Sequence, residues 1–416
     1  MIGRITVLGG SRVYIPEFMT SLISHNITVK EIVLVGRGGK KLRVVAEFCQ
    51  RLLDNSGLPA KVRSSCDLIE AVEGAKYIVS NVRVGGMTAR LRDEKLPVKY
   101  DMIGSESIGA GGFANAMRTL PVMMRYAEQI EAVNPGATFI NLTNPMGIVM
   151  EALLNHSNLK AVGLCDLPSK YVKKVARIFR REPSELSVNY LGVNHMGWIQ
   201  DVKIERKSRM FQLLERVRRH KEYDDFDYDL IELFRMIPTR AVSLYFNRNE
   251  ILKKQKSRTR FRAEMLYEAE QQILKLYENK DLHEVPELTK ERNALWYEEN
   301  LVPFIEAAET TKTSELILCV RNGQTIRDLP EDCSVEVPVG VSKRGIKARK
   351  VGSLPGFLKG LFIAVKESHR LTIEAVRHNS YEYALQALTI NPLVPSLSTA
   401  RQFLDHIIRE EGLELH

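Results

Sequence analysis

The sequence of 416 residues lacks the long apolar runs, closely spaced cysteines and low-complexity tracts that mark several classes of protein. No run approaches the roughly 18 apolar residues of a membrane-spanning helix, so we expect no membrane partner. The five cysteines show no paired spacing, which argues against a disulfide framework and favours a reducing compartment. Met1 leads directly into an apolar segment without a secretory leader, so the sequence predicts a cytoplasmic protein.

An excess of acidic residues is also absent, since 60 Lys and Arg outnumber 51 Asp and Glu and give a net charge of +9. Most basic residues alternate with acidic ones on predicted helical faces, so we expect no nucleic-acid partner. The exception is the basic run 253–262. A solvated helix surface and an anion-binding segment are equally good interpretations of this run.

The first half of the chain alternates short apolar strands with helices. Strands are predicted at 4–8, 31–35, 77–82, 137–142 and 160–164, and helices from residue 16, at 40–53 and at 113–133. This alternation is typical of an α/β fold with a Rossmann-like, doubly wound parallel sheet. The first strand ends in Gly9, Gly10 and Ser11 before Pro16 begins a helix, as in a dinucleotide-binding fold. The glycine-rich segment 83–112 is predicted to be a long functional loop.

Beyond about residue 200 the alternation stops. Helices are predicted through 210–310, including an amphipathic stretch at 262–277, then at 358–377 and 381–388, with strands at 315–319 and 333–341. These elements predict an α+β unit. We therefore expect two domains, a Rossmann-like dinucleotide-binding domain at 1–190 and an α+β domain at 191–416 that supplies substrate and oligomer contacts.

Two polar clusters follow apolar runs that are predicted to be buried strands. The first contains Asn144, Cys165 and Asp166, and the second contains His195. Cysteine and histidine are metal ligands, and open α/β sheets place their sites at the carboxyl ends of strands. One cysteine and one histidine are also common core residues, so these clusters alone do not establish a metal site.

Short motifs follow one another in a fixed order along nearly the whole chain. They are Gly9-Gly10, Tyr14-Ile15-Pro16-Glu17, Arg83-Val84-Gly85-Gly86, Arg90, Asp93-Glu94, Pro97-Val98-Lys99-Tyr100, Gly111-Gly112-Phe113-Ala114, Asn144-Pro145, Cys165-Asp166-Leu167-Pro168, Asn194-His195, Leu329-Pro330, Val335-Glu336-Val337-Pro338 and Asn391-Pro392-Leu393-Val394. In order and spacing, this series resembles the glycoside hydrolases of family 4, the NAD- and manganese-dependent 6-phospho-glucosidases.

The resemblance implies a mechanism different from the two-carboxylate scheme of ordinary glycosidases. NAD first removes a hydride from C3 of the sugar, which acidifies the proton at C2. A divalent metal, usually manganese, polarises the C3 and C2 oxygens. A base takes the C2 proton, the aglycone leaves C1, water adds and the hydride returns. A phosphorylated sugar substrate and a homodimer or homotetramer are implied as well.

The resemblance also implies roles for individual residues. Cys165 and His195 would bind the metal, and Asp166 would act as general acid. Arg90, Asn144 and Arg262 would contact the substrate and its phosphate, which the planar fork of an arginine binds well. Gly9, Gly10, Ser11, Arg37 and Arg83 would contact the cofactor. Asp166 resembles the α-specific members, whereas the rest of the chain resembles the β-specific members, so the sequence leaves anomeric specificity open.

The chain departs from the family pattern around the cofactor and the base. Ser11-Arg12 follows the two glycines where a third glycine and Ser or Thr are usual. Gly36-Arg37 replaces the acid expected at the ribose, which points to NADP or to weak NAD binding. Glu291-Arg292-Asn293 replaces an Arg-Gly-Gly motif.

The base tyrosine of the family aligns with Ala241, which cannot take a proton. Tyr245 or a metal-bound hydroxide is the candidate replacement. A catalytically impaired relative that binds a sugar phosphate or nucleotide without turnover is the main alternative to an enzyme. An ordinary NAD(P)-dependent dehydrogenase is less well supported, because no other base constellation is present. Retention of Cys165, Asp166 and His195 favours the enzyme.

Overall fold

The computed structural model describes residues 1–219, 226–292 and 294–416. Its N-terminal half contains parallel strands β1 (Ile2–Leu8), β2 (Val29–Val35), β3 (Lys61–Ser65), β4 (Tyr77–Ser80), β5 (Thr138–Asn141) and β6 (Lys160–Gly163). They lie in the order β3-β2-β1-β4-β5-β6, and each neighbouring pair is parallel. This is the strand order of dinucleotide-binding folds, and it confirms the predicted Rossmann-like sheet.

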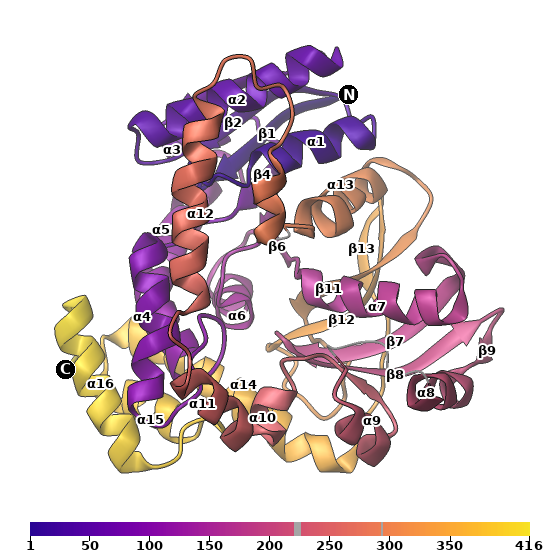
Figure 1. Cartoon of the computed structure of the whole chain (residues 1–416), viewed down its shortest axis with the longest axis vertical. Helices are drawn as coiled ribbons and strands as arrows, with labels where there is room; N and C mark the ends of the chain where they lie inside the picture. The colour runs from indigo at the N-terminus through magenta and orange to yellow at the C-terminus, as the bar shows by residue number, and fades with distance from the viewer. Residues whose placement is uncertain (220–225, 293) are drawn as a thin grey trace.

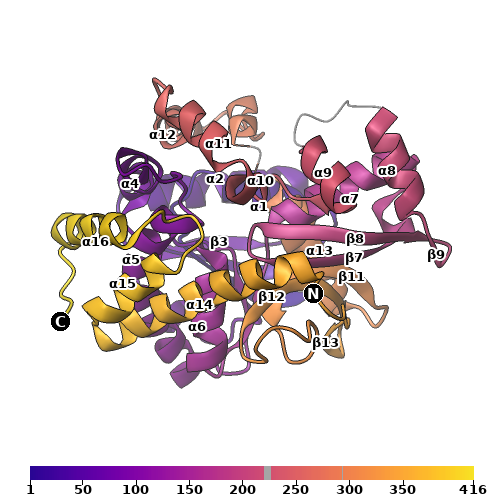
Figure 2. The same ribbon diagram turned by 90° about the horizontal axis from the view of Figure 1, so that it is seen from below.

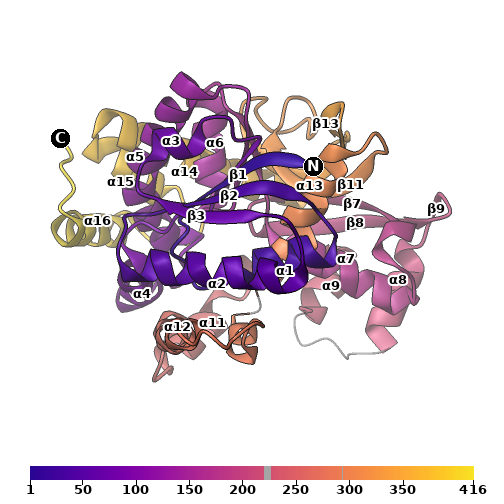
Figure 3. The same cartoon turned by 90° about the horizontal axis from the view of Figure 1, so that it is seen from above.

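Helices cover both faces of the parallel sheet (Figure 3). On one face lie α1 (Pro16–Ser24) and α2 (Lys40–Ser56), and on the other lie α3 (Leu68–Val72), α5 (Gly109–Val133) and α6 (Met146–His156). Strands buried on both faces are apolar along their whole length rather than alternating. In β1, for example, Ile5, Val7 and Leu8 are all fully buried.

The prediction that 83–112 is a loop is wrong for much of its length. The segment contains α4 (Gly86–Lys99), and α5 begins at Gly109. Periodic apolar residues are the main sequence signal of a helix. In α4 the buried positions include Arg90, Asp93 and Glu94, which form ion pairs inside the protein. Because charged residues occupy these buried positions, the sequence shows no apolar face that would predict this helix.

The sheet continues into the C-terminal half through antiparallel strands. β11 (Ser314–Arg321) pairs with β6, and beyond it follow β12 (Ser334–Ser342), β7 (Leu186–Val193), β8 (Met196–Ile204) and β10 (Ile237–Pro238). β9 (Lys207–Ser208) and β13 (Gly345–Ala348) pair at the side, which gives 13 strands in the described part of the chain. One sheet thus crosses the predicted boundary at residue 190.

The remaining helices follow β6 in the chain, and they pack partly around this antiparallel part and partly on the helices of the N-terminal half. They are α7 (Asp166–Phe179), α8 (Met210–Arg219), α9 (Tyr228–Phe234), α10 (Ser243–Phe246), α11 (Arg248–Lys256), α12 (Arg262–Tyr277), α13 (Val302–Glu309), α14 (Gly356–His378), α15 (Tyr381–Thr389) and α16 (Leu397–Glu411). Short helical turns lie at Pro183–Glu185, Glu287–Glu291 and Tyr297–Leu301. The predicted α+β character is confirmed, and α12 begins and ends at the predicted residues.

Two of these helices join the halves of the molecule. α12 crosses back over α4 and α2 (Figure 1). α14 runs beside α6 and leads through α15 to α16, which packs against α5 (Figure 2). Among the described helices, none is both long enough and apolar enough to cross a membrane.

Candidate active site

A cavity of about 470 Å³ lies where the carboxyl ends of the central strands meet. Its floor comes from the segments that follow five strands in turn: Arg12 after β1, Arg83 after β4, Asn144 after β5, Cys165 after β6 and His195 after β7. A crevice at this edge of an open α/β sheet is the usual place for a ligand.

The opposite wall comes from the C-terminal half. Arg240 and Ala241 lie just after β10, Arg258 lies between α11 and α12, and Arg262 is the first residue of α12. In the basic run 253–262, Lys256 pairs with Asp101 at the surface, whereas Arg258 and Arg262 line the cavity.

Cys165 stands at the junction of β6 and α7, where its buried thiol faces the cavity. Burial raises the pKa of Cys165 well above its usual value, and the carboxylates of Glu336 and Asp166 raise it further. The thiol is therefore protonated in the free protein. A divalent cation is the kind of charge that would convert it to a thiolate ligand.

His195 lies at the tip of the hairpin between β7 and β8, with a backbone φ of 64°. The hydroxyl of Thr239 donates a hydrogen bond of 2.6 Å to the carbonyl oxygen of His195, which holds this turn. Burial lowers the pKa of His195, so the imidazole is neutral, as metal binding requires.

Cys165 and His195 thus offer one sulfur and one nitrogen to the same cavity, and this donor set fits a divalent transition metal. In the described ranges, no group of three or more His, Cys, Asp and Glu side chains is arranged to hold a metal. Two protein ligands leave coordination positions for oxygen atoms of a bound sugar or of water.

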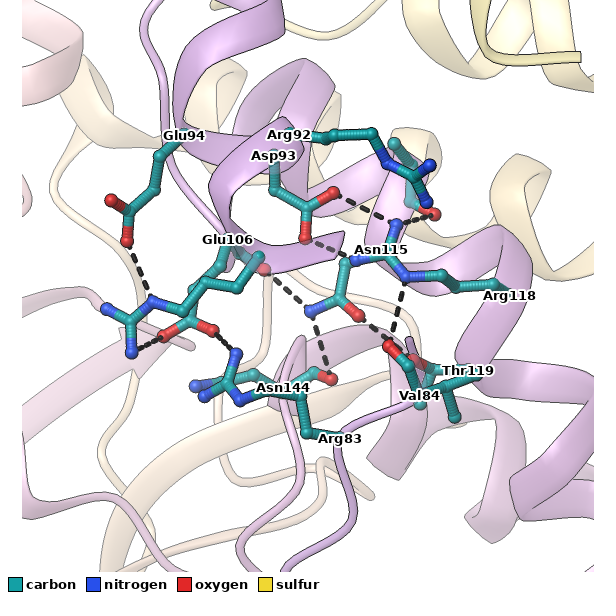
Figure 4. Close-up of polar contacts among 12 residues, drawn as sticks. Arg83, Val84, Arg92, Asp93, Glu94, Glu106, Asn115, Arg118, Thr119 and Asn144 are labelled. Atoms are coloured by element: carbon teal, nitrogen blue, oxygen red, sulfur yellow. Dashed lines mark hydrogen bonds and ion pairs between the residues drawn. The ribbon is translucent and has the colours of Figure 1, made fainter. Parts of the chain in front are cut away.

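An acidic residue organises the arginines at the base of the cavity. Arg83 and Arg90 both pair with Glu106, and Arg90 Nε also donates to Glu94 at 2.8 Å (Figure 4). Burial alone would raise the pKa of Glu106, but the two guanidinium groups outweigh it and hold this pKa far below the usual range. Arg83 and Arg90 are therefore neutralised before any ligand arrives.

Asn115 and Glu94 fix the segments around this cluster. The Asn115 amide donates to the carbonyl oxygens of Glu106 at 2.9 Å and Asn144 at 3.3 Å (Figure 4). Glu94 Oε2 accepts a bond of 2.9 Å from the backbone nitrogen of Ala263 in the first turn of α12. These contacts hold Asn144 and the start of α12 in place across the cavity.

The cavity carries a large excess of positive charge. Eight Lys and Arg side chains line it against three carboxylates, an excess of five. The basic residues are Arg12, Arg83, Arg90, Lys170, Arg240, Arg258, Arg262 and Arg292, and the acidic residues are Glu94, Glu106 and Asp166. Such a lining suits ligands with several phosphate oxygens.

Most of the site residues predicted from the sequence lie in this one cavity. They are Arg83, Arg90, Asn144, Cys165, Asp166, His195 and Arg262. Gly9, Gly10, Ser11, Arg37 and Tyr245 are not part of its lining. Gly9 has a φ of 85°, and a Cβ there would lie 2.4 Å from the Asn81 carbonyl oxygen, so this glycine allows the strand tips to approach. Arg37 is exposed at the end of β2.

The structure does not place Tyr245 where a replacement base would act. Ala241, just before α10, and Leu244 of α10 face the cavity, whereas Tyr245 of α10 packs against the hydrophobic core. Burial raises the pKa of Tyr245, which further disfavours proton abstraction. Of the departing motif Glu291-Arg292-Asn293, Asn293 lies outside the described residues, and Arg292 lines the cavity.

Several cavity residues had no predicted role, namely Arg12, Glu106, Lys170, Arg240, Arg292 and Trp296. Lys170 lies one helical turn after Asp166 and pairs with it at 2.5 Å, a spacing that the sequence does show. Arg12 and Arg292 appeared in the sequence only as departures from the family pattern.

Residues 4–180 match the model of the family 4 glycosyl hydrolases, and residues 190–394 match the model of their C-terminal domain. A probable 6-phospho-β-glucosidase of Bacillus subtilis is 32% identical over 97% of this chain and 95% of its own length. The chain belongs to family 4 of the glycosyl hydrolases.

Solved structures of the family agree over the whole chain. The 6-phospho-β-glucosidase of Thermotoga maritima, determined with manganese, NAD⁺ and glucose-6-phosphate, superposes with a TM-score of 0.91 at 29% identity, and the match covers 99% of this chain and 100% of that one. A 6-phospho-α-glucosidase from gut microorganisms, determined with NAD and glucose-6-phosphate, also gives 0.91, at 25% identity and with 100% of both chains covered. The family therefore includes both anomeric specificities on this fold.

Proposed function

We propose that this family 4 member is a 6-phospho-glucosidase that depends on NAD and a divalent metal, with manganese as the preferred ion. The observation that carries the proposal is one cavity that combines Cys165 and His195 with five surplus positive charges. The B. subtilis and T. maritima relatives, one named a probable 6-phospho-β-glucosidase and the other crystallised with these ligands, support it. The predicted cytoplasmic location and homodimeric or homotetrameric assembly stay predictions.

Residues in different parts of the cavity would have different roles. When bound, NAD would accept a hydride from the sugar and the metal would polarise the sugar oxygens. Arg262 at the start of α12 would bind the sugar phosphate, and burial together with Arg90 and Arg240 lowers the pKa of Arg262. A bound phosphate would relieve this crowding of like charges.

Asp166 would serve the leaving group as general acid. Lys170 Nζ donates to Asp166 Oδ2 at 2.5 Å, and both side chains line the cavity. The ammonium group stabilises the ionised carboxylate, so Asp166 needs a proton from solvent or from bound water before it can act as an acid. Its place in the cavity lining beside Cys165 supports a role in proton transfer to the departing oxygen.

Position 241, where the family has its base tyrosine, distinguishes an active from an impaired enzyme. Ala241 presents only a methyl group to the cavity, and none of the described cavity residues is a tyrosine. This observation favours a second candidate function, namely binding of a sugar phosphate or nucleotide with little turnover. Loss of a general base commonly lowers a rate by about 10² to 10⁴.

Restoring the base tests both candidates. We expect Ala241→Tyr to raise turnover of p-nitrophenyl 6-phospho-glucosides at least about tenfold in the presence of NAD, Mn²⁺ and reductant. Ala241→Phe is the matched control, since it adds the ring without the hydroxyl. Assays of both anomers would also assign specificity. If wild type and Ala241→Tyr bind NAD and Mn²⁺ but cleave neither anomer, the binding-only function is correct.

A further inference from the structure

The turn between β1 and α1 offers few free backbone donors to an anion. In dinucleotide-binding folds the pyrophosphate usually contacts backbone amides at the start of this helix. Here the amides of Arg12, Ile15, Glu17 and Phe18 all donate to backbone carbonyls within the turn. In addition, Glu17 places a carboxylate in the first turn of α1, which starts only at Pro16. The first turn of α1 itself therefore offers no free amide to an anion, and the amides without a backbone acceptor are those of Ser11, Val13 and Tyr14, which precede the helix.

Two arginines face the cavity next to this turn. Arg12 follows Gly9, Gly10 and Ser11 at the tip of β1, and Arg292 follows the helical turn Glu287–Glu291. Neither arginine forms an ion pair with another described residue, and buried Arg12 Nε and Arg292 Nη1 have no hydrogen-bond partner. Arg83, in contrast, is neutralised by Glu106.

Aromatic rings hold Arg292 in a defined orientation. Its guanidinium carbon lies 5.1 Å from the ring centre of Tyr14 and 5.1 Å from that of Trp296. Burial lowers the pKa of Arg12 to about 10, with a further contribution from Arg83, and burial together with Arg12 lowers that of Arg292. Both arginines are half-buried and have no ion pair, which lowers the stability of the free protein, and a bound dianion would remove that cost.

We infer that Arg12 and Arg292 form a side-chain clamp for the pyrophosphate of the dinucleotide, in place of backbone amides at the start of α1. The inference rests on the proposed function, because it assumes that a dinucleotide binds at the β1–β4 switch point. It also explains why both arginines occur where the chain departs from the family motifs. The sugar phosphate is assigned to the other wall, at Arg262.

Calorimetric titration separates the two anion positions. Wild type, Arg12→Gln, Arg292→Gln and Arg262→Gln would each be titrated with NAD, ADP-ribose and, in the presence of Mn²⁺, glucose 6-phosphate. We expect the first two variants to bind NAD and ADP-ribose at least about tenfold more weakly and glucose 6-phosphate within about twofold of wild type. Arg262→Gln should show the reverse pattern. Arg43→Gln, on the exposed side of α2, is the neutral control.

Thermal unfolding adds a second readout. Because Arg12 and Arg292 are unpaired, we expect the ligand-free Gln variants to unfold at or above the wild-type temperature, while NAD stabilises them less. Arg12→Lys keeps the charge but loses the planar fork, so its affinity for NAD should fall between wild type and Arg12→Gln.

The possible outcomes of these titrations distinguish failure of the clamp from failure of the proposed function. NAD affinity that is unchanged in Arg12→Gln and Arg292→Gln overturns the clamp and leaves the proposed function intact. Wild-type binding of ADP-ribose but not NAD, lost in both variants, supports the clamp and overturns the NAD-dependent function. If wild type binds glucose 6-phosphate but neither dinucleotide nor ADP-ribose, both are wrong.

Discussion

Burial shifts the pKa values of Cys165 and His195 in opposite directions. Burial favours the neutral form of each group, so the pKa of the thiol rises and that of the imidazole falls. The imidazole is ready to bind a metal, whereas the thiol must first lose its proton. Metal binding should therefore release a proton and become stronger as the pH rises.

Removal of either ligand should weaken metal binding. We expect Cys165→Ser and His195→Ala to lower Mn²⁺ affinity by about 10-fold or more, because each variant leaves a single protein ligand. Calorimetry or the paramagnetic relaxation of water protons measures this. Cys49→Ala, at a fully buried cysteine of α2 outside the cavity, is the control. Mn²⁺ affinity equal to wild type in both ligand variants would remove the metal assignment.

Arg37 bears on the choice between NAD and NADP. It stands at the end of β2, where an acid usually holds the adenosine ribose, and it is exposed. We expect NADP to bind as well as NAD or better, and Arg37→Ala to weaken NADP selectively by about threefold to tenfold. Titration with both dinucleotides checks this. A clear preference for NAD that Arg37→Ala leaves unchanged would contradict the prediction.

The sequence predicted the site residues whose position depends on where a strand ends. It missed the residues whose position depends on the direction in which a side chain points. Cys165, Asn144 and His195 could be predicted because each follows an apolar strand whose end lies at the shared edge of the sheet. Tyr245 could not, because in a short helix a shift of one position turns a side chain from the cavity to the core. Arg292 comes from a segment without a periodic pattern.

Among the elements, α11 and α12 form one wall of the cavity, and α11 makes few contacts with the elements around it. Gln255 of α11 makes two hydrogen bonds of 2.9 Å with the backbone of Gly104, one from its amide and one to its carbonyl. Gly104 in turn lies so close to Glu94 that a Cβ would be 1.9 Å from its carbonyl oxygen. The wall is thereby fixed against the loop that carries Glu106.

Loss of the Gln255 contact should loosen this wall. We expect Gln255→Ala to weaken glucose 6-phosphate binding by about tenfold, since two buried hydrogen bonds are lost. Hydrogen exchange at 103–107 should become faster as well. Gln271→Ala, at an exposed position of α12, is the matched control. Unchanged affinity together with faster exchange would show that the wall does not position the phosphate contacts.

Element prediction worked best where one face is apolar. The bounds of α12 were predicted at both ends, and those of β1 and β5 within two residues. In α4 ion-paired charges replace the apolar face, and no apolar pattern marks it. α16 was not predicted, although Ser396 caps it and Ala400, Phe403 and Ile407 form a buried stripe. A capping serine followed by a buried stripe at helical spacing is a sequence signal of a helix.

In the whole molecule, one continuous sheet crosses residue 190, where the sequence predicted a domain boundary. β11 lies beside β6, and one hydrophobic core contains Ile5 of the first half and Val337 of the second, both fully buried. The two family models nevertheless meet between residues 180 and 190. The two halves are thus separable in sequence but share one core.

A shared core predicts joint unfolding. We expect the intact chain to show a single calorimetric transition, and residues 1–190 alone to lack a cooperative transition, because the fragment exposes the β6 edge and one side of the core. Differential scanning calorimetry and circular dichroism of both proteins check this. An independent sharp transition of the fragment, near that of the whole chain, would contradict it.

The hairpin position of His195 has a consequence for recombination within the family. The turn Pro183–Glu185 contains no buried residue, and Cys165 precedes it while His195 follows it. A crossover between two family genes at this turn would build the metal site from two parents. The parent that supplies the C-terminal part would contribute the imidazole together with Arg262 and Arg292, whereas Arg12 and Cys165 would come from the other parent. The sugar site of such a recombinant would therefore combine Asn144 and Asp166 of one lineage with Arg262 of the other, provided that both parents pair β6 with β11 in the same register.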